Sequence, residues 1–274
     1  MTADRAVVSD FVDLPVGKVQ VLRGGSGQPV VYLHSATGEG LGLPLIDAMV
    51  ESYDVIAPMF PGFGESEGIE EVDDMEDAVF VLLDLFEALS IEAPVVVGQS
   101  LGGWMAAELT SRYPRRVGAL VLVNPVGLHL DGAPIKDIFS RSPGDMAEDL
   151  FADQSHPMAQ LMHALDDYRN DPAQIGNLTF DMVKPVIKHM GATARLGWDP
   201  YLHNPKLRKR LRRIDVPTLV VRGVQDTLVP EAHARTFAEE IPGAQYAELA
   251  DAAHLATVER GPELATLIRE FLDA

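Results

Sequence analysis

A run of β-branched residues leads directly into a serine between glycines near the middle of the chain. Residues 95–103 read Val-Val-Val-Gly-Gln-Ser-Leu-Gly-Gly, and residues 101–112 continue with the pattern of a helix. A strand that turns at once into a helix holds its turn residue in a strained conformation at the end of a sheet. Gly98 and Gly102 fit this turn, because a Cβ at either position would collide where strand and helix crowd together. We therefore expect the Ser100 hydroxyl to point into a cleft at the end of a sheet.

Backbone N–H groups at this turn are suited to stabilise negative charge. The amides of Ser100 and Leu101 fall at the start of the predicted helix, where unpaired N–H groups and the helix dipole favour an anion. The turn thus combines a nucleophile with half of an oxyanion hole. A plain connection between a strand and a helix has the same local pattern, so the rest of the chain must supply a base, an acid and a second N–H donor.

His254 and Asp226 are the residues that best complete a nucleophilic serine. Serine is protonated at neutral pH, so it needs a base with a pKa near neutrality and an acid that fixes the tautomer of that base. Asp226 follows a predicted buried strand on the edge that carries Ser100, and His254 lies in the exit loop of the last predicted strand. Asn124 ends an earlier strand but cannot carry a negative charge, and Asp251 more simply shapes the turn before the histidine.

The second oxyanion donor is predicted in the loop after an earlier buried strand. Residues 30–34 form this strand, and they run into a small, glycine-containing loop over residues 35–40. The N–H of Ala36 is the first choice for the donor, and the N–H of Ser35 is the second. His34 ends the strand beside this loop, where it either braces the turn or lines the substrate pocket.

A methionine-rich segment broken by prolines interrupts the alternation of strands and helices. That alternation indicates a parallel, doubly wound sheet that binds its ligands at the carboxyl ends of the strands. Residues 128–214 contain short helical pieces and no buried strand, which predicts a helical lid inserted into a core of residues 1–127 and 215–274. Met162 and Trp198 belong to this segment and are candidates to line an apolar substrate pocket.

Charge and composition exclude several classes of function. The 274 residues include 41 acidic and 22 basic side chains, and the formal net charge of −19 disfavours nucleic acid, anionic membranes and polyanionic substrates. The chain has no cysteine, which rules out disulfides, thiolate metal sites and a cysteine nucleophile. We find neither a signal peptide nor a membrane-spanning run, and we expect a soluble, cytoplasmic protein that acts on a small molecule as a monomer or small homo-oligomer.

Two charged clusters have simple structural interpretations. The acidic residues between Glu70 and Asp77 crowd the beginning of an amphipathic helix, where the helix dipole stabilises them, and they lack the spacing of a calcium loop. The basic residues between Lys206 and Arg213 form a solvated helix face. We therefore predict no metal site, no cofactor and no nucleic-acid-binding surface.

Motifs spread over nearly the whole chain outside the predicted lid resemble, as a set, those of serine hydrolases of the α/β-hydrolase fold. The chain departs from the family at Ser35 and Ala253, where a glycine is frequent. The resemblance implies an eight-stranded, mostly parallel sheet with the helical lid inserted after the sixth strand. The matching motifs are His34 to Gly38, Pro61-Gly62-Phe63-Gly64-Glu65-Ser66, Gly98 to Gly103, Gly223 to Asp226 with Val229-Pro230, and Ala253-His254 with Glu259 and Pro262.

The resemblance also implies a role for each candidate residue. Ser100 would be the nucleophile, Asp226 the acid and His254 the base. The N–H groups of Leu101 and Ala36 would hold the oxyanion. A serine at this position argues against dehalogenase and epoxide hydrolase chemistry, which in this fold is carried by aspartate.

Three functions remain open on the sequence alone. The first is hydrolysis of a neutral, fairly apolar carboxylic ester or lactone through an acyl-enzyme on Ser100. The second is carbon–carbon bond hydrolysis of ring-cleavage dienoic acids, for which Arg195 or Arg141 would bind the substrate carboxylate. The loop over residues 35–40 lacks the proline that is usual in those enzymes. The third is a non-catalytic protein that binds a ligand on this fold, for which an intact triad is unnecessary.

Overall fold

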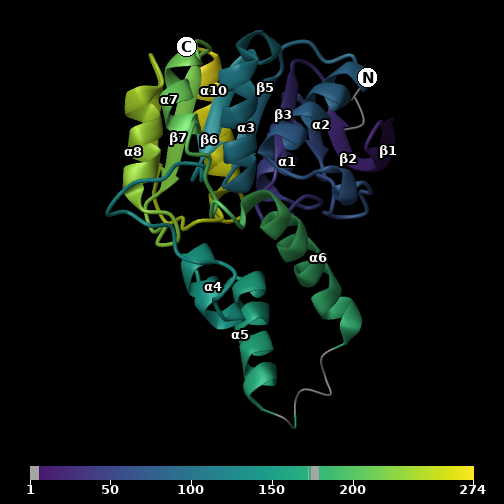
Figure 1. The fold of residues 1–274 in the computed structure, drawn as a ribbon, viewed down its shortest axis with the longest axis vertical. Coiled ribbons are helices and arrows are strands. Elements are labelled where there is room, and N and C mark those ends of the chain that lie inside the picture. The colour runs from purple at the N-terminus through teal and green to yellow at the C-terminus, as the bar shows by residue number, and fades with distance from the viewer. Residues whose placement is uncertain (1–5, 172, 174–178) are drawn as a thin grey trace.

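A computed structural model shows a sheet flanked by helices, with a helical arm at one edge (Figure 1). It describes residues 6–171, 173 and 179–274. The first five residues of the predicted core, and residues 172 and 174–178 of the predicted lid, lie outside the described residues. The strands are β1 (Val8–Leu14), β2 (Gly17–Gly25), β3 (Pro29–Leu33), β4 (Asp54–Pro58), β5 (Val95–Gln99), β6 (Ala119–Val123), β7 (Thr218–Gly223) and β8 (Gln245–Leu249).

Helices surround this sheet and also form the arm. Within the part of the chain that is described, no helix has both the length and the apolar character to cross a membrane. Around the sheet lie α1 (Pro44–Met49), α2 (Met75–Ala88), α3 (Leu101–Arg112), α8 (Glu231–Glu240), α9 (Ala256–Glu259) and α10 (Gly261–Leu272). Between β6 and β7 come α4 (Pro143–Leu150), α5 (Pro157–Asn170), α6 (Phe180–Gly197) and α7 (Leu207–Arg210).

The sheet has eight strands in the order β1-β2-β4-β3-β5-β6-β7-β8. β2 pairs antiparallel with β1 and β4, and the pairs from β4 through β8 are parallel. The predicted fold is therefore confirmed, including the helical insertion after β6.

The direction of the chain through the sheet reverses at β3. The connection from β3 to β4 runs toward one edge, whereas the connection from β4 to β5 crosses back to the other side of β3. Because such crossovers are right-handed, α1 lies on one face of the sheet and α2 and α3 lie on the other. A reversal of this kind leaves a crevice outside the carboxyl ends of the strands on either side of it. The loop after β3 and the residue after β5 therefore border the same crevice.

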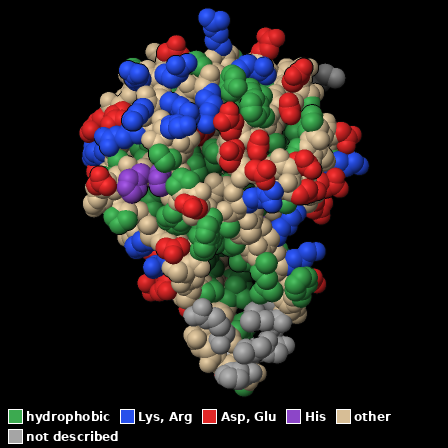
Figure 2. Space-filling view, in the orientation of Figure 1, with side chains coloured by type: hydrophobic (Ala, Val, Ile, Leu, Met, Phe, Trp, Pro, Cys, Tyr) green, Lys and Arg blue, Asp and Glu red, His purple; other side chains and the backbone are tan. Residues whose placement is uncertain are grey.

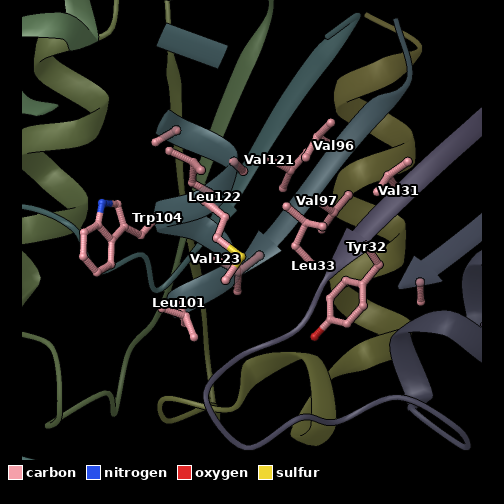
Figure 3. Close-up of a cluster of buried hydrophobic side chains, with 14 of the residues drawn as sticks. Val31, Tyr32, Leu33, Val96, Val97, Leu101, Trp104, Val121, Leu122 and Val123 are labelled. Atoms are coloured by element: carbon pink, nitrogen blue, oxygen red, sulfur yellow. The ribbon is translucent and has the colours of Figure 1, made fainter. Parts of the chain in front are cut away.

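The central strands are buried on both faces, which explains their unbroken apolar sequence. In β5, Val95, Val96 and Val97 expose 0%, 0% and 1% of their surface. Figure 3 shows the valines of this strand packed between side chains of β3 and β6, with Leu101 and Trp104 of α3 nearby. The turn at Ser100 thus follows a strand that is packed on both faces.

Of the insertion after β6, α4, α5 and α6 form the arm seen at the lower end of Figure 1, whereas α7 lies beside the sheet in contact with α3. The two ends of the insertion are joined at the core by a short parallel bridge between Gly127 and His203. α4 packs against α5, while α6 runs separately away from the sheet (Figure 1). The basic segment predicted as one helix face divides into α7 and a 3-10 turn over Leu211–Arg213.

A buried carboxylate fastens α3 to the base of the insertion, and its removal should destabilise the protein. Glu108 is fully buried, pairs with Arg112 at 2.5 Å and Arg210 at 3.5 Å, and accepts a hydrogen bond from Asn204 at 2.7 Å. We expect Glu108→Ala to lower the free energy of unfolding by about 3 kcal/mol, because it leaves these partners without their acceptor. Urea unfolding followed by circular dichroism measures this loss. An unchanged free energy of unfolding would show that Glu108 does not stabilise the contact between α3 and the insertion.

Candidate active site

Ser100 occupies a strained turn between β5 and α3. Its backbone has φ 54° and ψ −109°, a region that residues other than glycine rarely adopt. A Cβ on Gly98 would come within 2.3 Å of the Gly102 carbonyl oxygen, and a Cβ on Gly102 would come within 2.1 Å of the Leu33 carbonyl oxygen. The close approach involves β3 as well as the strand and helix of the turn itself.

The three predicted side chains meet at the carboxyl edge of the sheet. His254 Nε2 lies 2.8 Å from Ser100 Oγ, and His254 Nδ1 lies 2.8 Å from Asp226 Oδ2. All three residues are buried. The carboxylate is an acceptor only, so it fixes the imidazole proton on Nδ1 and leaves Nε2 free to accept the serine proton. This arrangement is chemically competent for nucleophilic attack by the hydroxyl.

Asp226 is itself held by the backbone that follows it. Its Oδ1 accepts hydrogen bonds from the N–H groups of Leu228 and Val229, both at 2.9 Å. One oxygen is therefore committed to the loop and the other to His254, which fixes the orientation of the carboxylate.

Two buried amide side chains, neither of them predicted from the sequence, hold the loop of the histidine. Asn124 Nδ2 donates to the carbonyls of Ala253 (3.0 Å) and His254 (2.9 Å), and its Oδ1 accepts from the Gly223 N–H at 2.9 Å. Gln99 Nε2 donates to the same His254 carbonyl at 2.7 Å. The sequence signal for this supporting position is the place of Asn124 at the end of the strand next to the one that carries Ser100.

The two predicted oxyanion elements differ in how many of their N–H groups are available. The N–H of Ser100 donates to the Val123 carbonyl at 2.9 Å, so the prediction that this amide is unpaired was wrong. The N–H of Ser35 donates to Glu39 Oε1 at 2.7 Å. Among the described residues, neither the N–H of Ala36 nor that of Leu101 donates a hydrogen bond. These two amides remain as candidate donors.

His34 braces the start of this loop. Its Nδ1–H donates to the Ser35 carbonyl at 2.7 Å, and its Nε2 accepts from the Phe60 N–H at 3.0 Å. Burial lowers the pKa of this imidazole, against a smaller opposing effect of the Glu39 carboxylate. Both nitrogens of a neutral ring are therefore used within the protein, so any contact of His34 with substrate would involve its carbon face.

The other predicted pocket residues lie on the arm. Trp198 follows α6, is 63% exposed and packs on Phe139 with ring centroids 5.0 Å apart. Met162 lies on α5 and is partly buried against the core cluster. Their contact with a substrate stays a prediction.

The insertion is tied to both sides of the site. On α6, His189 Nδ1–H donates to the Thr37 carbonyl at 2.8 Å, and its Nε2 accepts from the Gly64 N–H at 3.3 Å. Burial is the main cause that lowers the pKa of His189. On the other side, Glu259 accepts from the N–H groups of Ala253 (2.7 Å) and Ala152 (2.8 Å). One part of the insertion thus contacts the loop after β3, and another contacts the loop of the histidine.

The described residues contain no set of side chains arranged as metal ligands. No group of three or more His, Asp or Glu side chains in them is placed to hold a metal ion. The acidic residues near α2 are used locally, since Asp74 caps this helix by accepting from the N–H groups of Glu76 and Asp77.

A mostly parallel sheet with a buried serine–histidine pair at its carboxyl edge defines a serine hydrolase of α/β type. The chain belongs to the alpha/beta hydrolase fold family, whose model matches residues 28–260. This assignment confirms the resemblance seen in the sequence motifs.

Individual relatives differ in what they do. The chain is 28% identical to a dihydrolipoyllysine-residue acetyltransferase component of an acetoin cleaving system from Cupriavidus necator, over 98% of this chain and 70% of that one. It is 26% identical to a 2-hydroxy-6-oxo-6-(2'-aminophenyl)hexa-2,4-dienoic acid hydrolase of Metapseudomonas resinovorans, over 98% and 92%. Among solved structures, a serine hydrolase involved in carbazole degradation superimposes with a TM-score of 0.75 and 25% identity, over 98% and 99%.

Proposed function

We propose that this protein hydrolyses a neutral, fairly apolar carboxylic ester or lactone through an acyl-enzyme on Ser100. In the first half-reaction, Ser100 Oγ bonds to the carbonyl carbon while His254 Nε2 takes the hydroxyl proton. The tetrahedral intermediate then breaks its bond to the leaving oxygen, which receives that proton from His254. In the second half-reaction water attacks the acyl-enzyme, His254 takes a proton from the water, and the proton returns to Ser100 Oγ as the acid leaves.

The oxyanion of each intermediate is assigned to the N–H groups of Leu101 and Ala36. The N–H of Leu101 is the first of α3, so the helix dipole adds to its favourable interaction with negative charge. Ala36 is preferred to Ser35, because the Ser35 N–H already donates to Glu39. Loss of one such donor typically lowers turnover by about 10²- to 10³-fold.

The observation that favours a neutral substrate is that both candidate arginines already pair with carboxylates of the protein. Arg195 Nε donates to the Val72 carbonyl at 2.5 Å, and its Nη2 reaches the Asp73 carboxylate at 2.7 Å. Arg141 pairs with the buried Asp149 at 2.5 Å. A dienoic acid needs a cation to receive its carboxylate, and both arginines already serve carboxylates of the protein.

Carbon–carbon bond hydrolysis remains the second candidate because of the relatives. The dienoic acid hydrolase matches this chain over nearly the full length of both proteins. A non-catalytic role is disfavoured, because ligand binding does not require a buried serine, histidine and aspartate in hydrogen-bonded order.

Two sets of substrates separate the candidate reactions. We expect the purified protein to hydrolyse p-nitrophenyl esters graded from acetate to decanoate, with a chain-length optimum that reports the size of the apolar pocket. We expect little cleavage of a 2-hydroxy-6-oxohexa-2,4-dienoic acid followed by its absorbance. Faster cleavage of the dienoic acid than of every ester, with Arg195→Leu raising its KM, would replace the ester proposal with carbon–carbon hydrolysis.

A further inference from the structure

Four hydrogen-bond donors converge on one carboxylate in the loop after β3. Glu39 Oε1 accepts from the Tyr32 hydroxyl at 2.6 Å and from the Ser35 N–H at 2.7 Å. Its Oε2 accepts from the Ser35 hydroxyl at 2.6 Å and from the Thr37 hydroxyl at 2.7 Å. The carboxylate thus contacts the end of the strand and two separate positions of the loop that follows it.

The phenol of Tyr32 is held as a donor in this cluster. Burial, together with the charge of the nearby Glu39 carboxylate, raises the pKa of Tyr32 well above its usual value. Tyr32 is buried within β3, so its hydroxyl links Glu39 to the central sheet. Thr257 hydrogen-bonds the same hydroxyl at 3.3 Å.

The hydrogen bonds of this loop leave one of its first four N–H groups without an acceptor. The N–H of Ser35 donates to Glu39, the N–H of Thr37 donates to Ser35 Oγ at 3.1 Å, and the N–H of Gly38 donates to the Ser35 carbonyl at 3.1 Å. Within the described chain, Ala36 is the member of residues 35–38 whose N–H has no such partner. The loop borders the same crevice as Ser100, so the Ala36 N–H is available to receive an oxyanion.

We infer that Glu39 is a positioning residue that shapes the oxyanion loop and selects the Ala36 N–H as its donor. The inference rests on the proposed acyl-enzyme chemistry of Ser100. Glu39 constrains the loop of which it is itself a part, because its two oxygens accept hydrogen bonds from both the backbone N–H and the hydroxyl of Ser35. Ser35 stands where related hydrolases frequently have glycine, and its hydroxyl has a function in this chain as a donor to Glu39 and an acceptor for Thr37.

Two substitutions of Glu39 separate the effect of its hydrogen-bonding geometry from the effect of its negative charge. In Glu39→Gln, the amide oxygen can replace Oε1 and accept from Tyr32 and Ser35, and the amide NH₂ can replace Oε2 because a hydroxyl also accepts hydrogen bonds. Glu39→Ala removes every one of these acceptors and leaves a buried N–H unpaired. The glutamine variant should therefore keep the loop in place, and the alanine variant should not.

The rate at which Ser100 reacts with a fluorophosphonate tests this inference for any substrate class. Ser100 Oγ bonds to phosphorus, fluoride leaves, and the serine proton passes to His254, while the phosphoryl oxygen occupies the oxyanion site. We expect Glu39→Ala to react about 10²-fold more slowly than the wild type, as for loss of one donor, and Glu39→Gln to react at close to the wild-type rate. In ester hydrolysis the alanine variant should lower kcat and leave KM nearly unchanged.

The matched control is Glu67→Ala, which removes an exposed carboxylate outside this cluster that accepts from the Lys18 N–H at 3.3 Å. It should react nearly as fast as the wild type, and circular dichroism should show that all variants are folded. Wild-type reactivity in Glu39→Ala would overturn the inference and leave the proposed function standing. Equal slowing of the alanine and glutamine variants would overturn it too, because charge and not hydrogen-bonding shape would then matter. A folded wild type that does not react would overturn both, whereas reaction without ester turnover would overturn only the ester proposal.

Discussion

Replacing the hydroxyl of Ser100 should abolish turnover without unfolding the protein. The variant Ser100→Ala removes the atom that His254 Nε2 contacts at 2.8 Å, and no other hydroxyl is hydrogen-bonded to that nitrogen among the described residues. We expect kcat to fall by a factor on the order of 10⁶, as for loss of the nucleophile in other serine hydrolases. The initial rate of p-nitrophenyl ester hydrolysis measures the effect, with mass spectrometry confirming that no acyl adduct forms.

Fold and stability should hardly change in this variant. Ser100 hydrogen-bonds through its backbone to Val123 and Trp104, and alanine retains both of these contacts. Alanine also has a Cβ, so it carries the same strain at a positive φ as the serine does. Ser111→Ala is a matched control, because it deletes a buried hydroxyl from the helix that follows Ser100, and among the described residues this hydroxyl donates to the Glu108 carbonyl alone. It should retain full activity, and turnover that survives in Ser100→Ala would reject the acyl-enzyme proposal.

The fold could be predicted from sequence because its signals are local. An unbroken run of valines indicates a strand buried on both faces, and β5 is buried throughout. The rule that parallel strands expose their carboxyl ends at one edge then placed Ser100, Asp226 and His254 together. The structure places His254 within hydrogen-bonding distance of both Ser100 and Asp226.

The supporting residues could not be predicted in the same way, because their partners are set by packing. Asn124 contacts the carbonyl of His254, a residue 130 positions further along the chain. Glu39 is close in sequence to its partners, but nothing in a Ser-Ala-Thr-Gly-Glu segment indicates that the carboxylate turns back onto its own loop. The same limit applied to Arg195 and Arg141, whose type suggested an anion site although folding supplies each with a carboxylate of the protein.

The hydrogen bonds of Asp226 lead to a second large effect, for the variant Asp226→Asn. The Oδ1 atom accepts from two backbone N–H groups, so the asparagine must keep its oxygen there and turn its NH₂ toward His254. His254 Nδ1 must then accept a hydrogen bond, and the neutral ring carries its proton on Nε2, which faces Ser100 Oγ. A nitrogen that already holds a proton cannot take one from serine, so kcat should fall by about 10⁴-fold.

Asp251→Asn separates this tautomer effect from a general loss of negative charge near the histidine. Asp251 lies three residues before His254, but its side chain is 72% exposed and pairs with Arg260 at 3.0 Å. Such an exposed pair contributes little to stability, so this variant should keep wild-type turnover. Ester hydrolysis measured from acid to alkaline pH tests the pair of variants. Similar losses in both would show that net charge supports the reaction, whereas a loss confined to Asp226→Asn would show that the aspartate acts by fixing which nitrogen of His254 holds the proton.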